Sequence, residues 1–319
     1  MSLDLAFDDG QQAIADAVRQ FCADRCDDDV VKSTSGSFPR ELWSALAELG
    51  VLGVLSPEAE GGALECIAAV ESLGRAAFPG PLGATFVATQ LLEGRECARV
   101  ASGEAIVCLG VPPLLPWGSE ADVFLELGDE RVFRAQPAAP LRPVETLGGE
   151  PWARGDLERG EELAHGAVGW VVLRLVLAAQ SAALGQRLVE DASAHARVRK
   201  QFGRPIGDFQ AVAHPLADCS MRLAAAGSLA RAAAFHFDVG ETDAAGRFAA
   251  AAHLSASAAS LEAAHVCHQV FGAVGITLEG PVFHLSRRIR QLASQAPSQS
   301  SSRQRLLRET GFSLAGAPT

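Results

Sequence analysis

The second half of the chain is dominated by long helical stretches rich in alanine. After residue 161, small and apolar residues recur at intervals of three and four: Val168, Val171, Leu175, Ala178, Ala182, Gly185 and Val189. The same spacing returns beyond a turn at residues 205–207, in Val212, Leu216, Cys219 and Leu223. This spacing predicts helices whose small side chains allow close packing. With further helices expected over residues 242–270 and 281–292, residues 158–319 predict a four-helix bundle.

The first 103 residues also have helical patterns. Asp8 or Asp9 is expected to cap a first helix, and further helices are expected over residues 39–50, 63–77 and 82–92. A Pro-Gly-Pro break separates the last two of these helices. Residues 1–103 therefore predict an all-helical N-terminal domain.

Between these two parts, residues 104–157 have a different pattern. Short runs with strand-like composition occupy residues 105–109, 122–127 and 131–134, and prolines interrupt the segments around them. A β unit of this size must pack against its neighbours because it cannot form a large core alone. The fold class expected is mainly α, with a small β middle domain.

The residues beyond the last expected bundle helix are polar and basic. Residues 295–302 are rich in serine and glutamine, and they predict a loop or a mobile segment. The surrounding stretch without acids carries six arginines: Arg287, Arg288, Arg290, Arg303, Arg305 and Arg308. Half of them are expected on a solvated face, and the others are expected to contact phosphate or a partner subunit.

The charge of the chain limits its possible partners. Of its 319 residues, 27 are basic and 38 are acidic, which gives a formal net charge of −11 and argues against a general nucleic-acid binder. Only Lys32 and Lys200 are lysines, so any phosphate contact falls mainly to arginine, whose planar fork suits it. The chain contains no tyrosine, which excludes tyrosine as a catalytic acid or base.

Several features favour a cytoplasmic location. The seven cysteines are scattered without paired spacing, which indicates a reducing compartment, and Cys22 and Cys26 are expected in the core. The acidic N-terminal segment shows no secretory signal. The apolar run at residues 167–184 contains Arg174 near its middle, so a buried bundle helix is expected there rather than a membrane span.

Short motifs outside the helices give weak signals when each is taken alone. The glycine-rich residues 271–275 could approach a phosphate, but no strand precedes them, and a helix-terminating turn is the favoured interpretation. His265 and His268 lack the companions of a metal site and are expected to be ordinary bundle histidines. No metal site and no serine-hydrolase motif are predicted.

Two longer segments carry a specific resemblance. Residues 197–210, RVRKQFGRPIGDFQ, resemble the RxQFGxPIxxFQ signature of acyl-CoA dehydrogenases, and residues 269–281, QVFGAVGITLEGP, resemble the second signature, QxxGGxGxTxExP. Residues 38–62 are similar to the N-terminal domain of that family. The resemblance implies a helical domain, a β domain and a C-terminal bundle that follow one another along the chain.

The resemblance also implies a cofactor, FAD. In that family the C-terminal bundle of a dimer mate holds the pyrophosphate and adenosine portion of the flavin. These contacts correspond here to Arg199 and Gln201 of the first signature, and to Gln269 and Gly272 of the second. Ala273 departs from the signature, because a second glycine is usual there, and its methyl group is expected to narrow the approach to the backbone.

Two other parts of the family pattern are missing. The family's loop that covers the flavin ring in the middle domain is interpreted as deleted, since residues 108–113 lead almost directly to residues 121–122. The family's catalytic glutamate corresponds to Ala296 or, in other members, to Leu173, and neither is a carboxylate. No catalytic residue is therefore expected in this chain. Glu279 of the second signature is expected to be structural.

The resemblance is strongest to the short, non-catalytic subunit of heterotetrameric (α2β2) acyl-CoA dehydrogenases that act on steroid side-chain CoA thioesters. It implies a larger catalytic partner that supplies the base and most of the acyl-CoA site. Two alternatives stay open at this point: a complete homo-oligomeric enzyme whose base lies elsewhere, and a flavin-free structural subunit.

Overall fold

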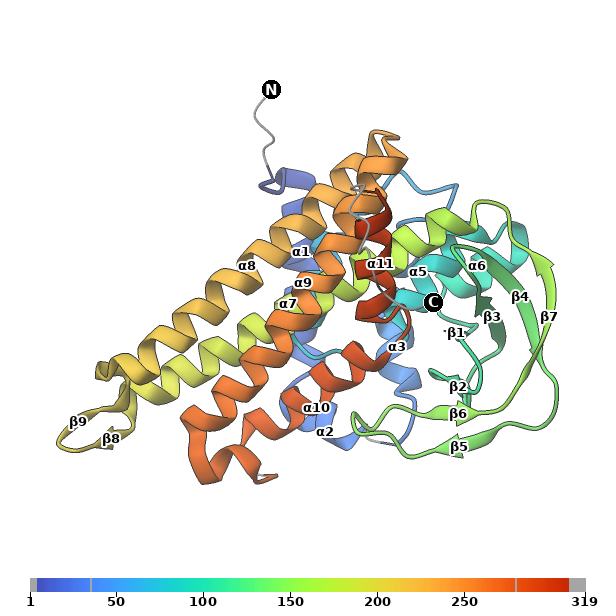
Figure 1. Cartoon of the computed structure of the whole chain (residues 1–319). Helices are drawn as coiled ribbons and strands as arrows, with labels where there is room; N and C mark the ends of the chain where they lie inside the picture. Colours follow the sequence, from blue (N-terminus) through green and yellow to red (C-terminus); the bar gives the residue numbers. More distant parts are fainter. Residues whose placement is uncertain (1–4, 35, 279, 310–319) are drawn as a thin grey trace, which may run out of the picture.

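The computed structural model describes residues 5–34, 36–278 and 280–309, and its N-terminal part is helical (Figure 1). Its helices are α1 (Asp9–Arg25), α2 (Asp28–Ser33), α3 (Arg40–Ala47), the 3-10 turn η1 (Val51–Gly53), α4 (Ala63–Arg75), α5 (Leu82–Leu91) and α6 (Gly94–Ala101). The four expected helical stretches are confirmed. Asp8 caps α1 and accepts a hydrogen bond from the Gln11 backbone N–H, while the Gln11 side chain accepts one from Asp8 N–H.

The middle of the chain forms two small sheets. The strands are β1 (Val107–Gly110), β2 (Leu114–Leu115), β3 (Val123–Leu127), β4 (Val132–Pro137), β5 (Arg142–Val144), β6 (Trp152–Arg154) and β7 (Leu157–Glu162). One sheet has the order β1-β3-β4-β7, in which β1 and β3 are parallel, and the other has the order β2-β6-β5. The three expected strands are confirmed as β1, β3 and β4. The polar strand β7 continues the first sheet past residue 157.

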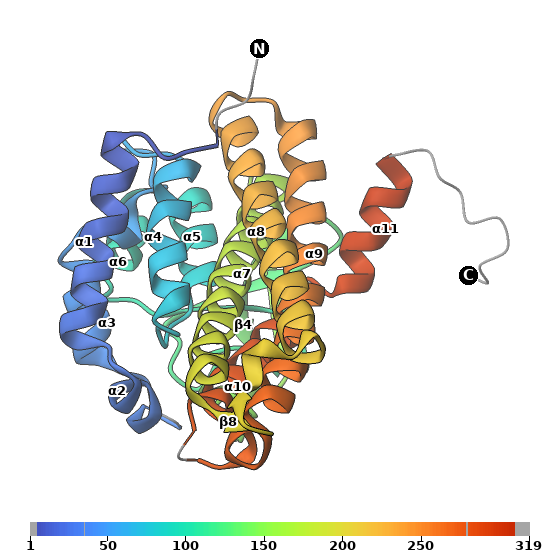
Figure 2. The same cartoon turned by 90° about the vertical axis from the view of Figure 1, so that its left-hand side faces the viewer.

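The C-terminal part is a helical bundle with a short hairpin at one end. It contains α7 (Gly166–Val198), the hairpin strands β8 (Lys200–Gln201) and β9 (Arg204–Pro205), the turn η2 (Ile206–Asp208), α8 (Gln210–Asp238), α9 (Thr242–Phe271), the turn η3 (Gly272–Ile276), α10 (Pro281–Ser294) and α11 (Gln299–Glu309). Figure 2 shows α7, α8 and α9 side by side, with the N-terminal helices on one flank and α11 on the other. The four expected bundle helices are confirmed.

Helix α7 passes through the middle of the molecule. By length and composition it is the one helix of the described residues that could cross a membrane, but 83% of its most apolar window is buried inside the protein. Its Leu173 and Leu175 belong to the core that joins the N-terminal helices to the bundle. The expected buried bundle helix is therefore present.

The tail differs from the expectation of a loop or mobile segment over residues 295–302. Helix α11 begins at Gln299, so half of that segment is helical. Serine and glutamine give little intrinsic drive for a helix, but tertiary contacts override this weak preference. Ser302 is fully buried, and its hydroxyl lies 3.0 Å from Nδ1 of His253 on α9. The helix is thus fixed to the bundle.

Two arginines of the basic stretch, Arg288 and Arg305, pair with acids of the middle domain, whereas Arg303 and Arg308 are exposed as expected. Arg288 is 7% exposed and forms an ion pair of 2.9 Å with the buried Glu150. Arg305 on α11 pairs with Glu130 at 2.5 Å, and Arg174 on α7 pairs with the same carboxylate at 2.7 Å. These arginines stabilise contacts between the middle domain and the bundle, a role that a linear sequence does not reveal.

All seven cysteines are free and buried. Cys22 and Cys26 lie in the core as expected, and burial raises the pKa of each thiol to about 12. Both side chains therefore act as small apolar groups rather than as nucleophiles.

Candidate functional site

The first signature forms the end of α7 and the β8–β9 hairpin. Arg199 ends α7, and it and Gln201 are exposed. The two turn residues, Phe202 and Gly203, have φ angles of 52° and 81°, as a tight two-residue hairpin turn requires. Such a backbone is unusual for phenylalanine, whose side chain is 91% exposed. The hairpin thus holds an aromatic ring in solvent beside a cation.

The second signature forms the end of α9 and the turn η3. Gln269 lies on an exposed face of α9, and Gly272 follows the last helical residue with a φ angle of 60°. Among the described residues, apart from the two chain neighbours, no heavy atom lies within 4 Å of the position that a Cβ would take on Gly272, so its backbone is open to a ligand. His268, one residue before Gln269, instead faces α10, where its Nε2 lies 2.8 Å from the Ser286 hydroxyl. Ala273 is exposed at the start of η3.

The fold brings both signatures to the same end of the bundle (Figures 1 and 2). The contact between them is a stack of His195 on α7 against Phe271 on α9, with ring centroids 4.4 Å apart. His195 lies one turn before Arg199, and Phe271 lies between Gln269 and Gly272 in the sequence. The four expected flavin-contacting residues therefore lie on two adjacent segments, and neither signature contains a signal for the stack that joins them.

The charge at this end is positive and comes from Arg197, Arg199 and Lys200, all of which are exposed. Partial burial and the nearby charge of Arg199 lower the pKa of His195. A lowered pKa leaves this ring neutral at pH 7, so the positive charge is carried by the three basic side chains around it. An anionic group such as a pyrophosphate is attracted to such a surface.

The same end exposes a group of large apolar side chains. The exposed fractions are 74% for Val198, 72% for Ile276 and 65% for Leu278, in addition to the 91% of Phe202. Scattered apolar residues are normal on protein surfaces, but a gathering of them beside cations is typical of a surface that another molecule covers. Glu279, which follows Leu278, lies outside the described residues.

The two positions expected to correspond to the family's base are packed within the chain. Leu173 is 3% exposed, and its Cδ1 lies 2.9 Å from where a Cβ would stand on Gly83 of α5. Ala296 follows α10 and packs against the core. Glu130 binds Arg174, the residue after Leu173, but its lowered pKa makes it a weak proton acceptor at neutral pH.

The connection between β1 and β3 is short and fastened to the middle domain. Val111 pairs with Leu114, and β2 then pairs with β6. Leu115 is fully buried and Trp117 is 2% exposed, whereas Val111 and Leu114 are 46% and 45% exposed. The connection offers no long exposed loop of the kind that covers a flavin ring.

Comparison with known proteins identifies the family. A model described as "Acyl-CoA dehydrogenase, N-terminal domain" matches residues 8–121, and one described as "Acyl-CoA dehydrogenase, C-terminal domain" matches residues 168–294. The chain belongs to the acyl-CoA dehydrogenase family. A similar curated protein is the acyl-CoA dehydrogenase IpdE2 of Mycobacterium tuberculosis, which is 31% identical over 76% of this chain and 78% of its own length. The family's activity is oxidation of an acyl-CoA by a flavin.

Solved structures of the acyl-CoA dehydrogenase fold cover nearly the whole chain. The ChsE4-ChsE5 complex of Mycobacterium tuberculosis contains a chain with a TM-score of 0.84 and 22% identity, covering 98% of this chain and 100% of that one. The Tcur3481-Tcur3483 steroid ACAD variant gives a TM-score of 0.83 at 22% identity, with 96% and 99% covered. These likenesses confirm the acyl-CoA dehydrogenase fold, a helical N-terminal part, a small β part and a C-terminal bundle.

Proposed function

We propose that this chain is the non-catalytic subunit of a flavin-dependent acyl-CoA dehydrogenase complex. The chain would bind the diphosphate and adenosine end of FAD, and a larger partner subunit would supply the base and the flavin-ring site. The supporting observation is that both signatures meet at one exposed, basic end of the bundle, while Ala296 and Leu173 stand at the base positions.

The residues present fit one half of FAD. Arg199 would bind the pyrophosphate, Gln201 and Gln269 would donate or accept hydrogen bonds, and the open backbone at Gly272 would allow close approach. The short β1–β3 connection, which is paired within the middle domain, does not fit the ring half. FAD, when bound, would accept the hydride that leaves Cβ of the substrate. This chain would hold the cofactor and exclude water from its diphosphate end.

The substrate class we propose is a steroid side-chain CoA thioester, taken up mainly by the partner. This proposal is supported by the likeness to the Tcur3481-Tcur3483 steroid ACAD and to the ChsE4-ChsE5 complex, both of which are named as assemblies of two components. We also propose a cytoplasmic location. The supporting observation is that all seven cysteines are free and buried, as is typical of proteins in a reducing compartment.

Co-expression with the larger subunit tests the shared site. We expect a yellow heterotetramer that holds one flavin for each pair of unlike chains, because each site needs one signature-bearing bundle from this chain and one ring pocket from the partner. Absorbance of released flavin against protein concentration measures the ratio. One flavin for every chain would contradict the shared site. A yellow single-chain protein that oxidises acyl-CoA would indicate a complete enzyme, and a colourless but intact complex would indicate a flavin-free structural subunit.

The role of Arg199 gives a second prediction. Replacing Arg199 by alanine in the complex should weaken FAD binding by about tenfold to a hundredfold, because a charge-assisted hydrogen bond contributes about 1.5–3 kcal/mol. Folding should change little, since Arg199 is exposed and ends a helix. Flavin fluorescence during dilution measures the affinity. Arg222→Ala, which removes an exposed arginine from α8, is the control and should retain flavin. Equal affinity in both variants would exclude Arg199 from the site.

A further inference from the structure

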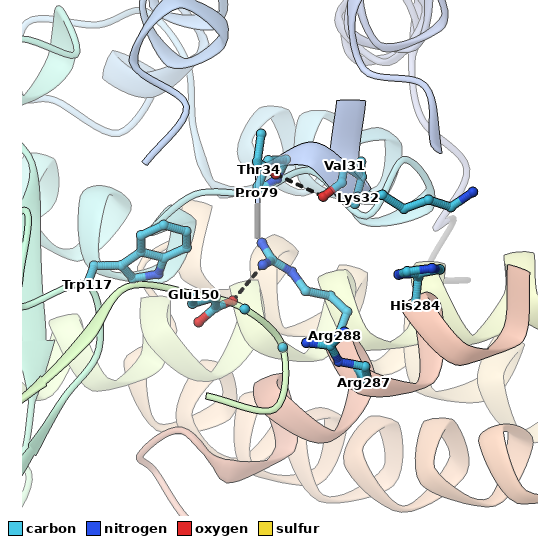
Figure 3. Close-up of a pocket in the computed structure, with 11 residues that line it drawn as sticks. Val31, Lys32, Thr34, Pro79, Trp117, Glu150, His284, Arg287 and Arg288 are labelled. Atoms are coloured by element: carbon cyan, nitrogen blue, oxygen red, sulfur yellow. Dashed lines mark hydrogen bonds and ion pairs between the residues drawn. The ribbon is translucent and has the colours of Figure 1, made fainter. Parts of the chain in front are cut away.

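A small cavity lies where α2, the β5–β6 loop and α10 meet (Figure 3). It contains none of the four residues assigned to FAD. Lys32, Trp117, Glu150, His284, Arg287 and Arg288 are among its lining residues, and the backbone of Gly148 and Gly149 completes one wall. Three of the side chains are cationic and one is anionic. In a chain with a net charge of −11, this concentration of positive charge is local.

Arg288 is the most buried of these cations. Its guanidinium pairs with Glu150 at 2.9 Å and donates to the carbonyl oxygen of Phe78 at 2.7 Å. Nevertheless, its Nε has no acceptor among the described residues, although it is buried. The two contacts hold the guanidinium in place, so Arg288 contributes a fixed positive charge to the wall of the cavity.

Arg287 and Lys32 have N–H groups that can donate hydrogen bonds to a ligand. Within the described part of the chain, the one hydrogen bond of Arg287 runs from Nε to the carbonyl oxygen of Leu147. Its two terminal nitrogens are therefore available to donate to a ligand. Lys32 has a single ion pair, 3.3 Å long, with Asp29, whose side chain is 91% exposed. Such an exposed pair is weak and can be exchanged for a better acceptor.

The size of the cavity selects the ligand. Its volume is about 60 Å³. A water molecule needs about 10–15 Å³ on this measure, so the cavity holds about four to six water-sized atoms. A flavin ring or an adenine is too large, whereas phosphorus with its four oxygens fits. The lining charge of three cations and Glu150 also matches the charge of about −1.5 to −2 on a phosphate monoester near pH 7.

We propose that this cavity binds a phosphate group, either as free phosphate or as the phosphate end of a larger molecule. Arg287 and Lys32 would contact the phosphate oxygens from opposite walls, and the fixed positive charge of Arg288 would attract the anion. The bound group would then join α2, the β5–β6 loop and α10. This site does not depend on the FAD proposal, because it involves different residues.

Isothermal titration with inorganic phosphate, on the protein in its purified assembly at low ionic strength, tests the proposal. We expect saturable binding of one phosphate per chain with a Kd at or below about 1 mM. Arg287→Gln should weaken binding by about tenfold or more, since it removes a charged donor. Arg303→Gln, which changes an exposed arginine of α11, is the matched control and should bind as the unaltered protein does.

Two outcomes would overturn the site: no saturable binding by the unaltered protein, or equal weakening in the Arg287 and Arg303 variants, which would show general attraction to positive charge. Should Arg287→Gln fail to fold by circular dichroism, Lys32→Gln provides the same test, because the side chain of Lys32 is partly exposed and weakly paired. Competition by CoA but not by its 3′-dephospho form would assign the phosphate to a larger molecule, and competition by neither would assign it to free phosphate.

Discussion

Replacing Glu130 by glutamine is expected to lower the free energy of unfolding by about 3–5 kcal/mol, the usual cost of leaving a buried charge without its partner. Arg174, which is fully buried on α7, donates to both oxygens of Glu130, at 2.7 and 3.2 Å. Its guanidinium also lies 5.0 Å from the ring centre of Trp170. The substitution keeps the shape but removes the negative charge. Denaturant unfolding followed by circular dichroism measures the loss.

Two variants separate this ion pair from a general surface effect. Glu161→Gln changes an exposed glutamate of β7 and should leave the midpoint unchanged. The double variant Glu130→Gln with Arg174→Met should be more stable than Glu130→Gln alone, because the uncompensated buried charge is gone. Equal stability of the two variants would show that leaving the buried charge of Arg174 without its partner does not destabilise the protein.

Acid should weaken the same contact. Burial raises the pKa of Glu130, but the hydrogen bonds and charges of Arg174 and Arg305 outweigh burial and lower the pKa. A carboxyl whose pKa is lower in the folded state stabilises the protein above its unfolded pKa, about 4.3, and loses that contribution as the pH falls through the folded value. The stability difference between the unaltered protein and Glu130→Gln should therefore narrow below about pH 4.

The elements that sequence predicted are those with a clear period. In helix α4, apolar residues recur at intervals of three and four and are buried, and in strand β3 the alternating Val123, Leu125 and Leu127 are buried. Strand β7, with the sequence LERGEE, has no apolar alternation and forms because β4 offers it a partner edge. Helix α11 is similar, because Ser302 and Arg305 fix it to distant residues. Such elements depend on tertiary contacts, which local patterns do not contain.

The candidate site shows the same division. Arg199 and Gly272 belong to signatures that are continuous segments of the sequence, so both can be predicted from it. The fold places both at one end of the bundle. The stack of His195 on Phe271, which joins the two signatures, links residues 76 positions apart and has no signal in either motif. The sequence also does not reveal the ion-pair partners of Arg288 and Arg305, because these partners, Glu150 and Glu130, lie far away in the middle domain.

The largest catalytic effect is expected from a residue outside this chain. An acyl-CoA dehydrogenase needs a carboxylate to remove the α proton, and loss of a general base costs about 10²–10⁴-fold in rate. From the resemblance, Leu173 and Ala296 are expected at the corresponding positions, and two guanidinium groups hold Glu130 as the ionised partner of an ion pair. A chain that retained its own chemistry would need a free carboxylate at one of these positions.

We therefore expect that replacing the partner's base glutamate by glutamine lowers acyl-CoA oxidation by about 10²–10⁴-fold while flavin stays bound, because only the proton acceptor is lost. Steady-state dye reduction by the co-purified complex measures the rate. Ala296→Ser in this chain is the control and should retain the rate, since it alters the corresponding position without adding a base. Glu279→Gln should also retain the rate, because Glu279 is expected to have a structural role and not a catalytic one. A folded, flavin-loaded complex that lost all activity with Glu279→Gln would place catalysis in this chain and refute the assignment.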